Sequence, residues 1–468
     1  MMYFRILCLE RKSQGTPSWI WKMFCNRAVD FKCAAGAGLA LFFLLTASAS
    51  ATTRFVRAGG SGTGASWAAA WSNLSSISWS ALSPGDVVCV AGGSYSGSIN
   101  TAKSGTSGNP ITIRRATASD PTCGSSTSGW SSSYDAQVVM TGNIEIDNDY
   151  ITIDGAVSNG ISVTMQNPSG SVYEGICFCG GPTTGGIVRY VEVAGPCGTS
   201  ACAQNNDHRS LVFEHWNGSD YDKATSPLIQ YVNLHGACNN MVIYGTVNLV
   251  VEHSRMADSA TTNTANCHPN IVNTGETSGT TTWRYNEMTN WQVEGIMLLG
   301  GAGWDIYGNI WHDPMQGSYP RVVEAQNGTE GPVHFYNNTV VNLYYICAST
   351  SNGGSYASGT IGEDNLYIGN NFANCGLPTE DYDYSDQSLK SETHGQGSST
   401  NPFVSLSGQN FELTKDTSAG LSLASPYNVD YVGVIRGSDG TWDRGAYQFV
   451  SQTTQGPNPA TSLTVTVR

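Results

Sequence analysis

Three segments of the sequence repeat one pattern: WRYNEMTN (283–290), IYGNIWHD (306–313) and FYNNTVVN (335–342). In each segment an asparagine stands fourth, a bulky apolar residue stands sixth, and a polar turn residue comes last. The turn residues of successive segments are 23 and 29 residues apart. A unit of this length with a fixed turn and β-rich flanks is typical of a solenoid, in which each repeat forms one coil.

The pattern extends in both directions from these segments. The further turn positions are Gly155, Gly195, Gly236 and Asp258 upstream and Asn374 downstream. Successive intervals are 40, 41, 22, 32, 23, 29 and 32 residues, and the shortest fit one bare coil. The longest fit either two short coils or one coil with an insertion. Because second apolar runs lie between these segments, each coil should carry at least two short strands.

The repeated asparagines predict a ladder inside the solenoid. Asn286, Asn309 and Asn338 fall at one place in consecutive coils, and we expect Asn370 to continue the series. Stacked side-chain amides can bond to one another and to turn backbone groups that the interior would leave unpaired.

The composition agrees with a turn-rich, all-β protein. The chain has 468 residues, 54 of them glycine, and only 12% are charged. No long segment keeps a helical period. A solenoid remains one domain however long it grows, because each coil contacts only its neighbours.

The N-terminus is typical of an export signal. Residues 34–51 form an apolar run that ends in small residues and follows Arg27 and Lys32. We expect residues 1–51 to be a signal peptide cut after Ala51, with Met23 a better start than Met1. The run is short for a membrane span, and no other candidate follows, so we expect a secreted, extracellular or periplasmic protein.

The charge of the remaining chain excludes some partners. Residues 1–51 hold six Lys or Arg and two Asp or Glu, which leaves 16 basic and 34 acidic residues and a net charge of −18. Such a body repels nucleic acid. An anionic polysaccharide would be repelled too, unless a local basic patch or a bound cation compensates. We expect a monomer that binds polysaccharide.

Ten cysteines remain after residue 51, and an even number in an exported chain favours disulfides. Spacing makes three pairs plausible without proving the connectivity: Cys197–Cys202, Cys238–Cys267 and Cys347–Cys375.

Motifs near both ends resemble those of secreted β-helix proteins. PGDVVCVAGGSY (84–95) and GTSGNPITIR (105–114) stand near the start, after a GASWAAAW run (64–71) that could form a lid on the first coil. DYVGVIR (430–436) and DRGAY (443–447) stand near the end. The chain is similar in these motifs to the pectate-lyase-like superfamily. That resemblance spans about residues 54–450 and implies an all-β, right-handed parallel β-helix of roughly ten coils, with N-terminal and C-terminal caps.

The expected organisation follows from the repeat and from the resemblance. We assign 52–135 to the N-terminal cap and first coils, 136–376 to the parallel β-helix repeats, 377–450 to the final coils and C-terminal cap, and 451–468 to a linker or tail.

The candidate site comes from polar residues in the second apolar runs. Equivalent side chains of adjacent coils lie about 4.8 Å apart. His268, Glu294 and Arg321 are separated by 26 and 27 residues, about one coil each, so they could form a ladder on one face. We predict catalytic roles for these three and for Glu324. Substrate-binding roles are predicted for Asn270, Gln326 and Trp291.

The resemblance implies two chemistries for this face. Polysaccharide lyases remove the proton beside a uronate carboxylate; here His268 or Arg321 would be the base, with Glu294 and Glu324 holding Ca²⁺. Glycoside hydrolases instead use paired carboxylates, for which Glu294 and Glu324 are the candidates. The chain lacks the complete catalytic motif of any named enzyme family, so we carry over no activity residue by residue.

Structural interpretations compete with these roles. Glu294 could be a solvated turn residue, Arg321 and Glu324 a surface pair, and His268 a residue that shapes a disulfide-bound loop. Trp291 could equally belong to an aromatic stack inside the helix. The leading hypothesis is a lyase acting on a uronate-containing glycan. The alternatives are a hydrolase and a non-catalytic surface or adhesion protein.

Overall fold

The computed structural model describes residues 51–166, 173–202, 207–262, 267–389 and 391–451. The chain divides into two compact units, Met1–Ser48 and Ala49–Arg468, and the description concerns the second. The predicted signal peptide lies outside the described residues except for Ala51, and the predicted tail lies outside them except for Ser451.

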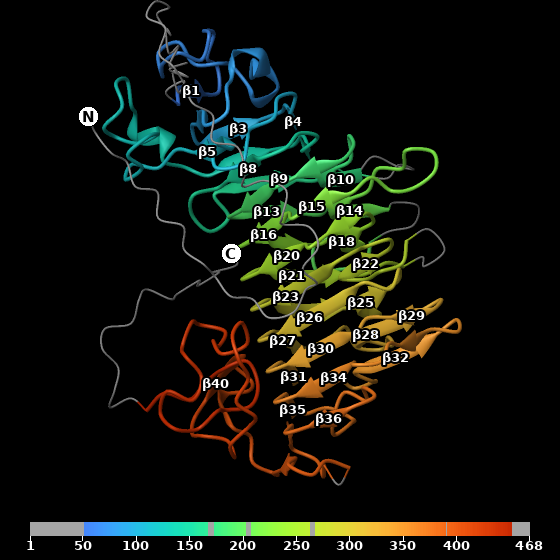
Figure 1. Cartoon of the computed structure of the whole chain (residues 1–468). Helices are drawn as coiled ribbons and strands as arrows, with labels where there is room; N and C mark the ends of the chain where they lie inside the picture. The colour runs from blue at the N-terminus through green and yellow to red at the C-terminus, as the bar shows by residue number, and fades with distance from the viewer. Residues whose placement is uncertain (1–50, 167–172, 203–206, 263–266, 390, 452–468) are drawn as a thin grey trace, which may run out of the picture. The chain divides into compact units, whose positions relative to one another are not determined.

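Three long parallel sheets account for most of the described strands (Figure 1). Sheet A has twelve strands, in this order: β1 (Thr53–Val56), β2 (Val87–Val90), β5 (Ile111–Arg115), β8 (Ile151–Asp154), β12 (Ile187–Arg189), β16 (Leu228–Gln230), β20 (Val250–Glu252), β23 (Thr280–Arg284), β26 (Gly303–Tyr307), β30 (Val333–Tyr336), β34 (Ile361–Glu363) and β36 (Glu380–Asp381).

Sheet B also has twelve strands: β3 (Gly93–Tyr95), β6 (Val138–Met140), β9 (Ile161–Thr164), β13 (Val191–Ala194), β17 (Asn233–His235), β21 (Arg255–Ser259), β24 (Glu287–Trp291), β27 (Ile310–His312), β31 (Thr339–Val341), β35 (Leu366–Ile368), β37 (Tyr384–Ser385) and β38 (Gln396–Gly397). Sheet C has nine: β4 (Ile99–Asn100), β7 (Ile144–Glu145), β10 (Tyr173–Phe178), β14 (His208–Phe213), β18 (Asn239–Ile243), β22 (Val272–Thr274), β25 (Glu294–Leu298), β28 (Arg321–Gln326) and β32 (Ala348–Ser351).

Minor elements complete the list. Short parallel sheets are formed by β11 (Thr183–Thr184), β15 (Ala224–Thr225) and β19 (Thr246–Val247), and by β29 (Thr329–Glu330) with β33 (Ser355–Tyr356). An antiparallel hairpin is formed by β39 (Phe403–Ser405) and β40 (Asn410–Leu413). The short 3-10 helices are η1 (Leu74–Ser76), η2 (Trp79–Ala81) and η3 (Ser132–Tyr134).

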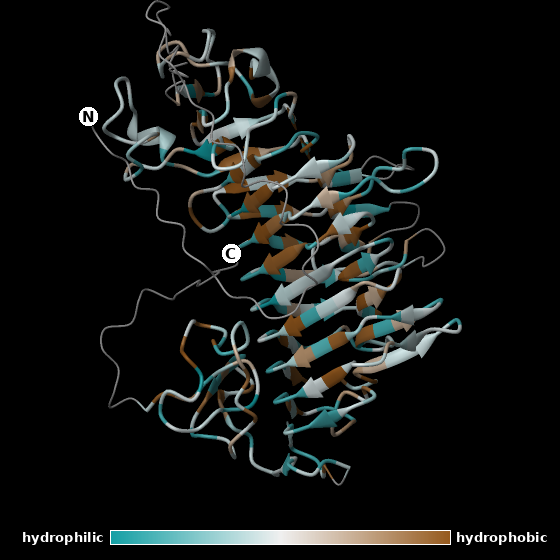
Figure 2. Cartoon of the chain, in the orientation of Figure 1, coloured by the Kyte–Doolittle hydropathy of each residue, from teal (hydrophilic) through white to brown (hydrophobic). Residues whose placement is uncertain are grey.

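The chain runs through sheets A, B and C in turn and pairs each strand with its equivalent one coil later. This order is that of a parallel β-helix, which confirms the predicted fold class. Hydrophobic residues recur along the strands of successive coils (Figure 2), and their buried side chains form one core cluster. One column in sheet A is fully buried along its length: Val188, Ile229, Val251, Trp283, Ile306 and Phe335. Burying each of these side chains contributes about 1.5–3 kcal/mol.

The asparagine ladder is present, with one correction. The side-chain oxygens of Asn309 and Asn338 accept the backbone N–H groups of Asn286 and Asn309, over 2.9 and 3.1 Å. The next rung is Asn365, whose oxygen accepts from the N–H of Asn338 over 2.9 Å. The prediction that Asn370 continues the ladder is wrong, because this residue bonds elsewhere, to the backbone of Leu343.

The predicted turn positions are in register only in the middle of the chain. Gly195, Gly236, Asp258, Asn290, Asp313 and Asn342 occupy equivalent positions at the ends of sheet B strands, and Asp258 and Asn290 stand one residue before the end of theirs. Gly155 instead follows a sheet A strand, and the rung after Asn342 is Gly369 rather than Asn374. Asn290, Asp313 and Asn342 have φ of 50, 48 and 57°, a left-handed turn that asparagine and aspartate tolerate.

The end motifs have structural roles. Trp67 and Trp71 are buried, and a parallel β-bridge joins Trp71 to Val56 of β1. Near the other end, the Arg436 guanidinium donates to the carbonyl of Asp443 over 3.0 Å, and a carboxylate oxygen of Asp430 accepts the N–H of Val434 over 2.7 Å. These hydrogen bonds hold the last segment in place. The motifs therefore have a structural role, and they predict the fold and not the reaction.

The three predicted disulfides are all present, and Cys89 pairs with Cys123 in addition. Within the described part of the chain, no helix combines the length and the apolar character that crossing a membrane requires.

Candidate functional site

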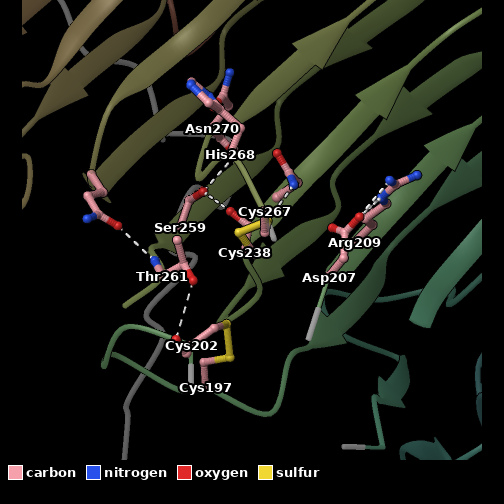
Figure 3. Close-up of a disulfide and its surroundings, with 12 residues drawn as sticks. Cys197, Cys202, Asp207, Arg209, Cys238, Ser259, Thr261, Cys267, His268 and Asn270 are labelled. Atoms are coloured by element: carbon pink, nitrogen blue, oxygen red, sulfur yellow. Dashed lines mark hydrogen bonds and ion pairs between the residues drawn. A yellow bond between two sulfur atoms is a disulfide. The ribbon is translucent and has the colours of Figure 1, made fainter. Parts of the chain in front are cut away.

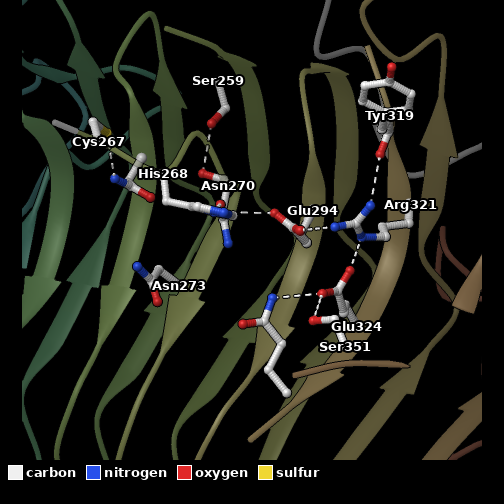
Figure 4. Close-up of polar contacts among 12 residues, drawn as sticks. Ser259, Cys267, His268, Asn270, Asn273, Glu294, Tyr319, Arg321, Glu324 and Ser351 are labelled. Carbon is white, nitrogen blue, oxygen red and sulfur yellow. Dashed lines mark hydrogen bonds and ion pairs between the residues drawn. The ribbon is translucent and has the colours of Figure 1, made fainter. Parts of the chain in front are cut away.

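The candidate site lies on the outward face of sheet C, where three of the predicted residues meet (Figure 4). Glu294, the first residue of β25, pairs in register with Arg321, the first residue of β28. Asn270 precedes β22, and the register of Val272 with Ile296 brings it beside Glu294. Asn270, Glu294 and Arg321 come from successive coils, so the parallel register places them side by side.

Arg321 links two acidic residues. Its guanidinium forms ion pairs with Glu294 through Nη2 and with Glu324 through Nε. The two carboxylate side chains are 0% and 2% exposed, whereas the arginine side chain is 16% exposed. Only a planar guanidinium presents donors in a fixed fork that can hold two carboxylates at once. The surface-pair interpretation of Arg321 and Glu324 is therefore wrong.

Glu324 has a full set of partners besides Arg321. Gln326 donates to its Oε1 over 2.6 Å, Ser351 donates to the same oxygen, and Ser349 donates to Oε2 over 2.9 Å. A buried carboxylate with this many donors is fixed and satisfied. The structure thus gives Glu324 and Gln326 the geometry of residues that position Arg321.

His268 is the accessible member of the cluster. Its side chain is 44% exposed, and Nδ1 lies 3.3 Å from Oε2 of Glu294. Oδ1 of Asn270 lies 2.6 Å from the same ring nitrogen, where it accepts the hydrogen bond when Nδ1 carries the proton. A carboxylate beside Nδ1 favours the tautomer with the proton on that atom. We assign this tautomer, which leaves the Nε2 lone pair free to accept a proton.

Glu294 is a charged group in a buried position. Burial raises the pKa of its carboxyl, while the nearby Arg321 and His268 lower it and Glu324 raises it. Since the side chain is fully buried in a strand, the interpretation of Glu294 as a solvated turn residue is wrong. A buried carboxylate between a cation and an imidazole is suited to orienting both.

The chain holds His268 firmly on both sides (Figure 3). Cys267, the preceding residue, forms a disulfide with Cys238, which stands immediately before β18. Two residues after His268, the carbonyl of Asn270 accepts the hydroxyl of Ser259 over 2.7 Å. The imidazole is therefore presented from a short, anchored stretch of backbone, as a catalytic side chain requires.

Trp291 does not belong to the outward face. Its ring is 0% exposed, packs against Trp311 at 6.0 Å between ring centroids, and donates from Nε1 to the carbonyl of Arg321 over 3.0 Å. The prediction that it stacks on a sugar is wrong, because no face of the ring reaches solvent. Gln326 and Asn270 are also buried, at 9% and 0%, so their contacts are with the site and not with solvent.

The expected Ca²⁺ ligands do not fit a cation as they are placed. Glu294 and Glu324 both pair with the guanidinium of Arg321, and Glu324 also accepts three neutral donors. Ca²⁺ takes six to eight oxygen ligands and would have to displace a cation that is already bound. We derive no step through a metal ion at this site.

Sequence reasoning missed the two serines and Glu174. Ser349 and Ser351 follow Glu324 by one coil, yet serine is too common in this chain to stand out. In the same column of sheet C, Glu174 of β10 pairs in register with Arg209 of β14, as Glu294 does with Arg321. The ion pairs of Arg209 are with Asp207 and Glu214, so this second group of charged residues is built differently from the one around Arg321.

Comparison with known proteins supports the fold. No protein-family model and no curated protein matches the sequence. By structure, the chain is similar to pectate lyase Pel9A, at 12% identity over 85% of this chain and 96% of that one, with a TM-score of 0.53. It also matches an alginate lyase from Paenibacillus sp. strain FPU-7, at 14% identity over 74% and 98% of the two chains, with a TM-score of 0.43. The first likeness confirms a pectate-lyase-like β-helix as the fold, and the second is too weak to argue from.

Proposed function

We propose that the protein is an exported polysaccharide lyase that cleaves a uronate-containing glycan by β-elimination, with His268 as the base. The observation that carries this proposal is the contrast within the cluster: His268 is 44% exposed, while Glu294 and Glu324 are buried and paired with Arg321. The disulfides support export, because such bonds persist in oxidising compartments.

The chemistry needs one base and one group that faces the uronate carboxylate. Nε2 of His268 takes the proton from C5, the electron pair forms the C4–C5 double bond, and the C4–O bond breaks. The leaving oxygen then takes a proton from the imidazolium or from water. The guanidinium of Arg321, partly exposed, has N–H groups beyond those that hold Glu294 and Glu324, and these can donate to the substrate carboxylate.

Hydrolysis by paired carboxylates is the alternative. Burial raises the pKa of Glu294, as a general acid requires. However, neither Glu294 nor Glu324 has an exposed oxygen to approach a glycosidic bond, since their side chains are 0% and 2% exposed. The exposed histidine therefore favours elimination over hydrolysis.

The test is a product assay with the full chain. The protein is incubated with pectate, alginate and a neutral glycan, with and without EDTA, while ultraviolet absorbance and reducing ends are followed. We expect a uronate glycan to give both ultraviolet absorbance and reducing ends. Both signals should persist in EDTA, because Arg321 pairs with the carboxylates of Glu294 and Glu324. Reducing ends without absorbance would establish hydrolysis, and neither signal on the panel would favour the adhesion alternative. A requirement for Ca²⁺ would support the earlier expectation that Glu294 and Glu324 hold the ion.

A further inference from the structure

An exposed aromatic patch lies next to the candidate site. Tyr319 and Tyr345 are 66% and 48% exposed, and the neighbouring Ile346 is 37% exposed. Among the residues that the structure describes, these two are the only tyrosines with so much exposed surface. Contiguous exposed apolar surface on a soluble protein marks a place where something binds.

The two rings touch each other and come from different coils. Their centroids are 5.4 Å apart at an interplanar angle of 73°, an edge-to-face arrangement. In such a pair, the ring that offers its edge keeps both faces clear of its partner. The patch therefore presents flat apolar surface to the solvent.

The patch is built on a rigid support. The hydroxyl of Tyr344, beside Tyr345, donates to the carbonyl of Ser318 over 3.1 Å and accepts the N–H of Ser318 over 2.9 Å, which ties the two loops together. Cys347, just after Ile346, forms a disulfide with Cys375. Exposed rings on an anchored backbone are preorganised for binding.

The patch is continuous with the cluster around Arg321. Nη1 of Arg321 donates to the carbonyl of Tyr319 over 3.3 Å, and Figure 4 shows Tyr319 beside the guanidinium. The contact is made by the backbone carbonyl, so the residue that carries the exposed ring borders the guanidinium.

We infer that Tyr319 and Tyr345 form a subsite that stacks on a sugar ring of the glycan, next to the sugar bound at His268 and Arg321. The inference rests on the proposed function for the identity of the ligand. One face of a pyranose ring carries mainly C–H groups, which pack on an aromatic face, and binding sites commonly combine aromatic surfaces with a few charged groups.

The test compares variants that keep or remove the ring. Tyr319→Ala and Tyr345→Ala should each raise KM for the cleaved oligosaccharide about tenfold and leave kcat unchanged, because stacking acts on binding alone. Tyr319→Phe should retain the wild-type KM, since the ring and not the hydroxyl makes the contact. Tyr382→Ala is the matched control, because Tyr382 stacks on His394 at the end of sheet A, outside the cluster.

A binding measurement separates this inference from the proposed reaction. Affinity electrophoresis in gels that contain pectate or alginate measures glycan retention even where no cleavage occurs. We expect Tyr319→Ala and Tyr345→Ala to reduce the retention and Tyr382→Ala to leave it unchanged. This result would support the subsite whether or not the protein is a lyase. An unchanged KM and unchanged retention in both alanine variants would overturn the subsite and leave the lyase proposal intact. An equal loss in the control variant would also overturn it.

Discussion

At the scale of single residues, the site depends on one arginine that balances two buried acids. Glu294 and Glu324 have almost no contact with solvent, so their charges are stabilised by Arg321 and by the donors around it. Removing one partner of a buried pair costs far more than removing a surface pair. Arg321 is therefore both a candidate ligand for the substrate and a support for the fold around it.

Arg321→Lys keeps the charge but cannot bridge both carboxylates. We expect it to lower the free energy of unfolding by about 3–5 kcal/mol, because one buried carboxylate is left without a cation. Urea unfolding of the full chain measures this change. Arg54→Lys is the control, since Arg54 makes a single long contact, 3.4 Å from Nη2 to the carbonyl of Ala81. Equal stability of the two variants would contradict the buried role of Arg321.

Sequence spacing identified the site residues only in part. The intervals of 26 and 27 residues placed His268, Glu294 and Arg321 in one cluster, because one coil brings such residues into contact. The direction of Trp291 could not be predicted in the same way. This residue ends β24 at the turn into sheet C, and loops of unequal length interrupt the alternation that would assign a side chain to the core or to the surface.

At the scale of elements, the asparagine ladder satisfies backbone groups at the turns between sheets A and B. The amide of Asn309 donates to the carbonyl of Trp283 over 2.8 Å, and its oxygen accepts the N–H of Asn286 over 2.9 Å. All three residues are buried. A residue without a side-chain amide at this position would leave two backbone groups unpaired in a dry interior.

Asn309→Ala should lower the free energy of unfolding by about 2–6 kcal/mol, which is about 1–3 kcal/mol for each of the two unpaired groups. Asn100→Ala, at an exposed strand end, should change stability by less than about 0.5 kcal/mol. Chemical denaturation of both variants checks the difference. Equal free energies of unfolding for the two variants would show that the ladder contributes nothing to stability.

The disulfide beside His268 should affect catalysis as well as stability. The double variant Cys238→Ala/Cys267→Ala removes a bond that closes 29 residues, and Cys89→Ala/Cys123→Ala removes one that closes 34. Both should cost about 3–4 kcal/mol of stability, given the similar loop lengths. Only the first should lower kcat, about tenfold or more, because it frees the stretch that carries His268. Equal kcat in the two variants would show that the bond does not position the imidazole.

The repeat predicted the register of the middle coils and failed at both ends, and at the N-terminal end the physical reason is clear. Between Gly195 and Asn342 the turn residues stand in register at the ends of the sheet B strands. Strands of sheet A also end at small or polar turn residues, so ITIDG at residues 151–155 resembles a sheet B strand while lying in sheet A. The prediction of at least two short strands in each coil agrees with the three sheets, of which some strands are only two or three residues long.

At the scale of the whole molecule, buried carboxyl groups make stability depend on pH. Burial raises the pKa of Asp364 to about 7, of Glu380 to about 7 and of Asp443 to about 6. Between about pH 4, the usual value for an unfolded carboxyl, and pH 7, the folded chain therefore binds more protons than the unfolded chain. The free energy of unfolding falls as pH rises through this range. Asp313 has the opposite effect, because a hydrogen bond with His312 lowers its pKa to about 2. Its contribution to the free energy of unfolding is therefore lost as the pH falls below about 4.

We therefore expect the highest Tm between about pH 4 and 5, with a decline toward neutral pH. Asp364→Asn should flatten the decline, because an amide of the same shape does not titrate. Scanning calorimetry of the wild type and this variant from about pH 4 to 8 checks the prediction. A Tm that rises steadily toward pH 7 in the wild type would contradict it.

The most direct measurement is the ultraviolet absorbance of the unsaturated product formed from pectate or alginate by three proteins: the wild type, His268→Ala, and His334→Ala. His334 is the control because it pairs with Asp305 on sheet A, at 2.7 Å between Nδ1 and Oδ1. We expect the wild type and His334→Ala to form the product at similar rates, and His268→Ala to be slower by about 10²–10⁴-fold, as for loss of a general base. A His268→Ala protein that forms the product at the wild-type rate would contradict the assignment of His268 as the base.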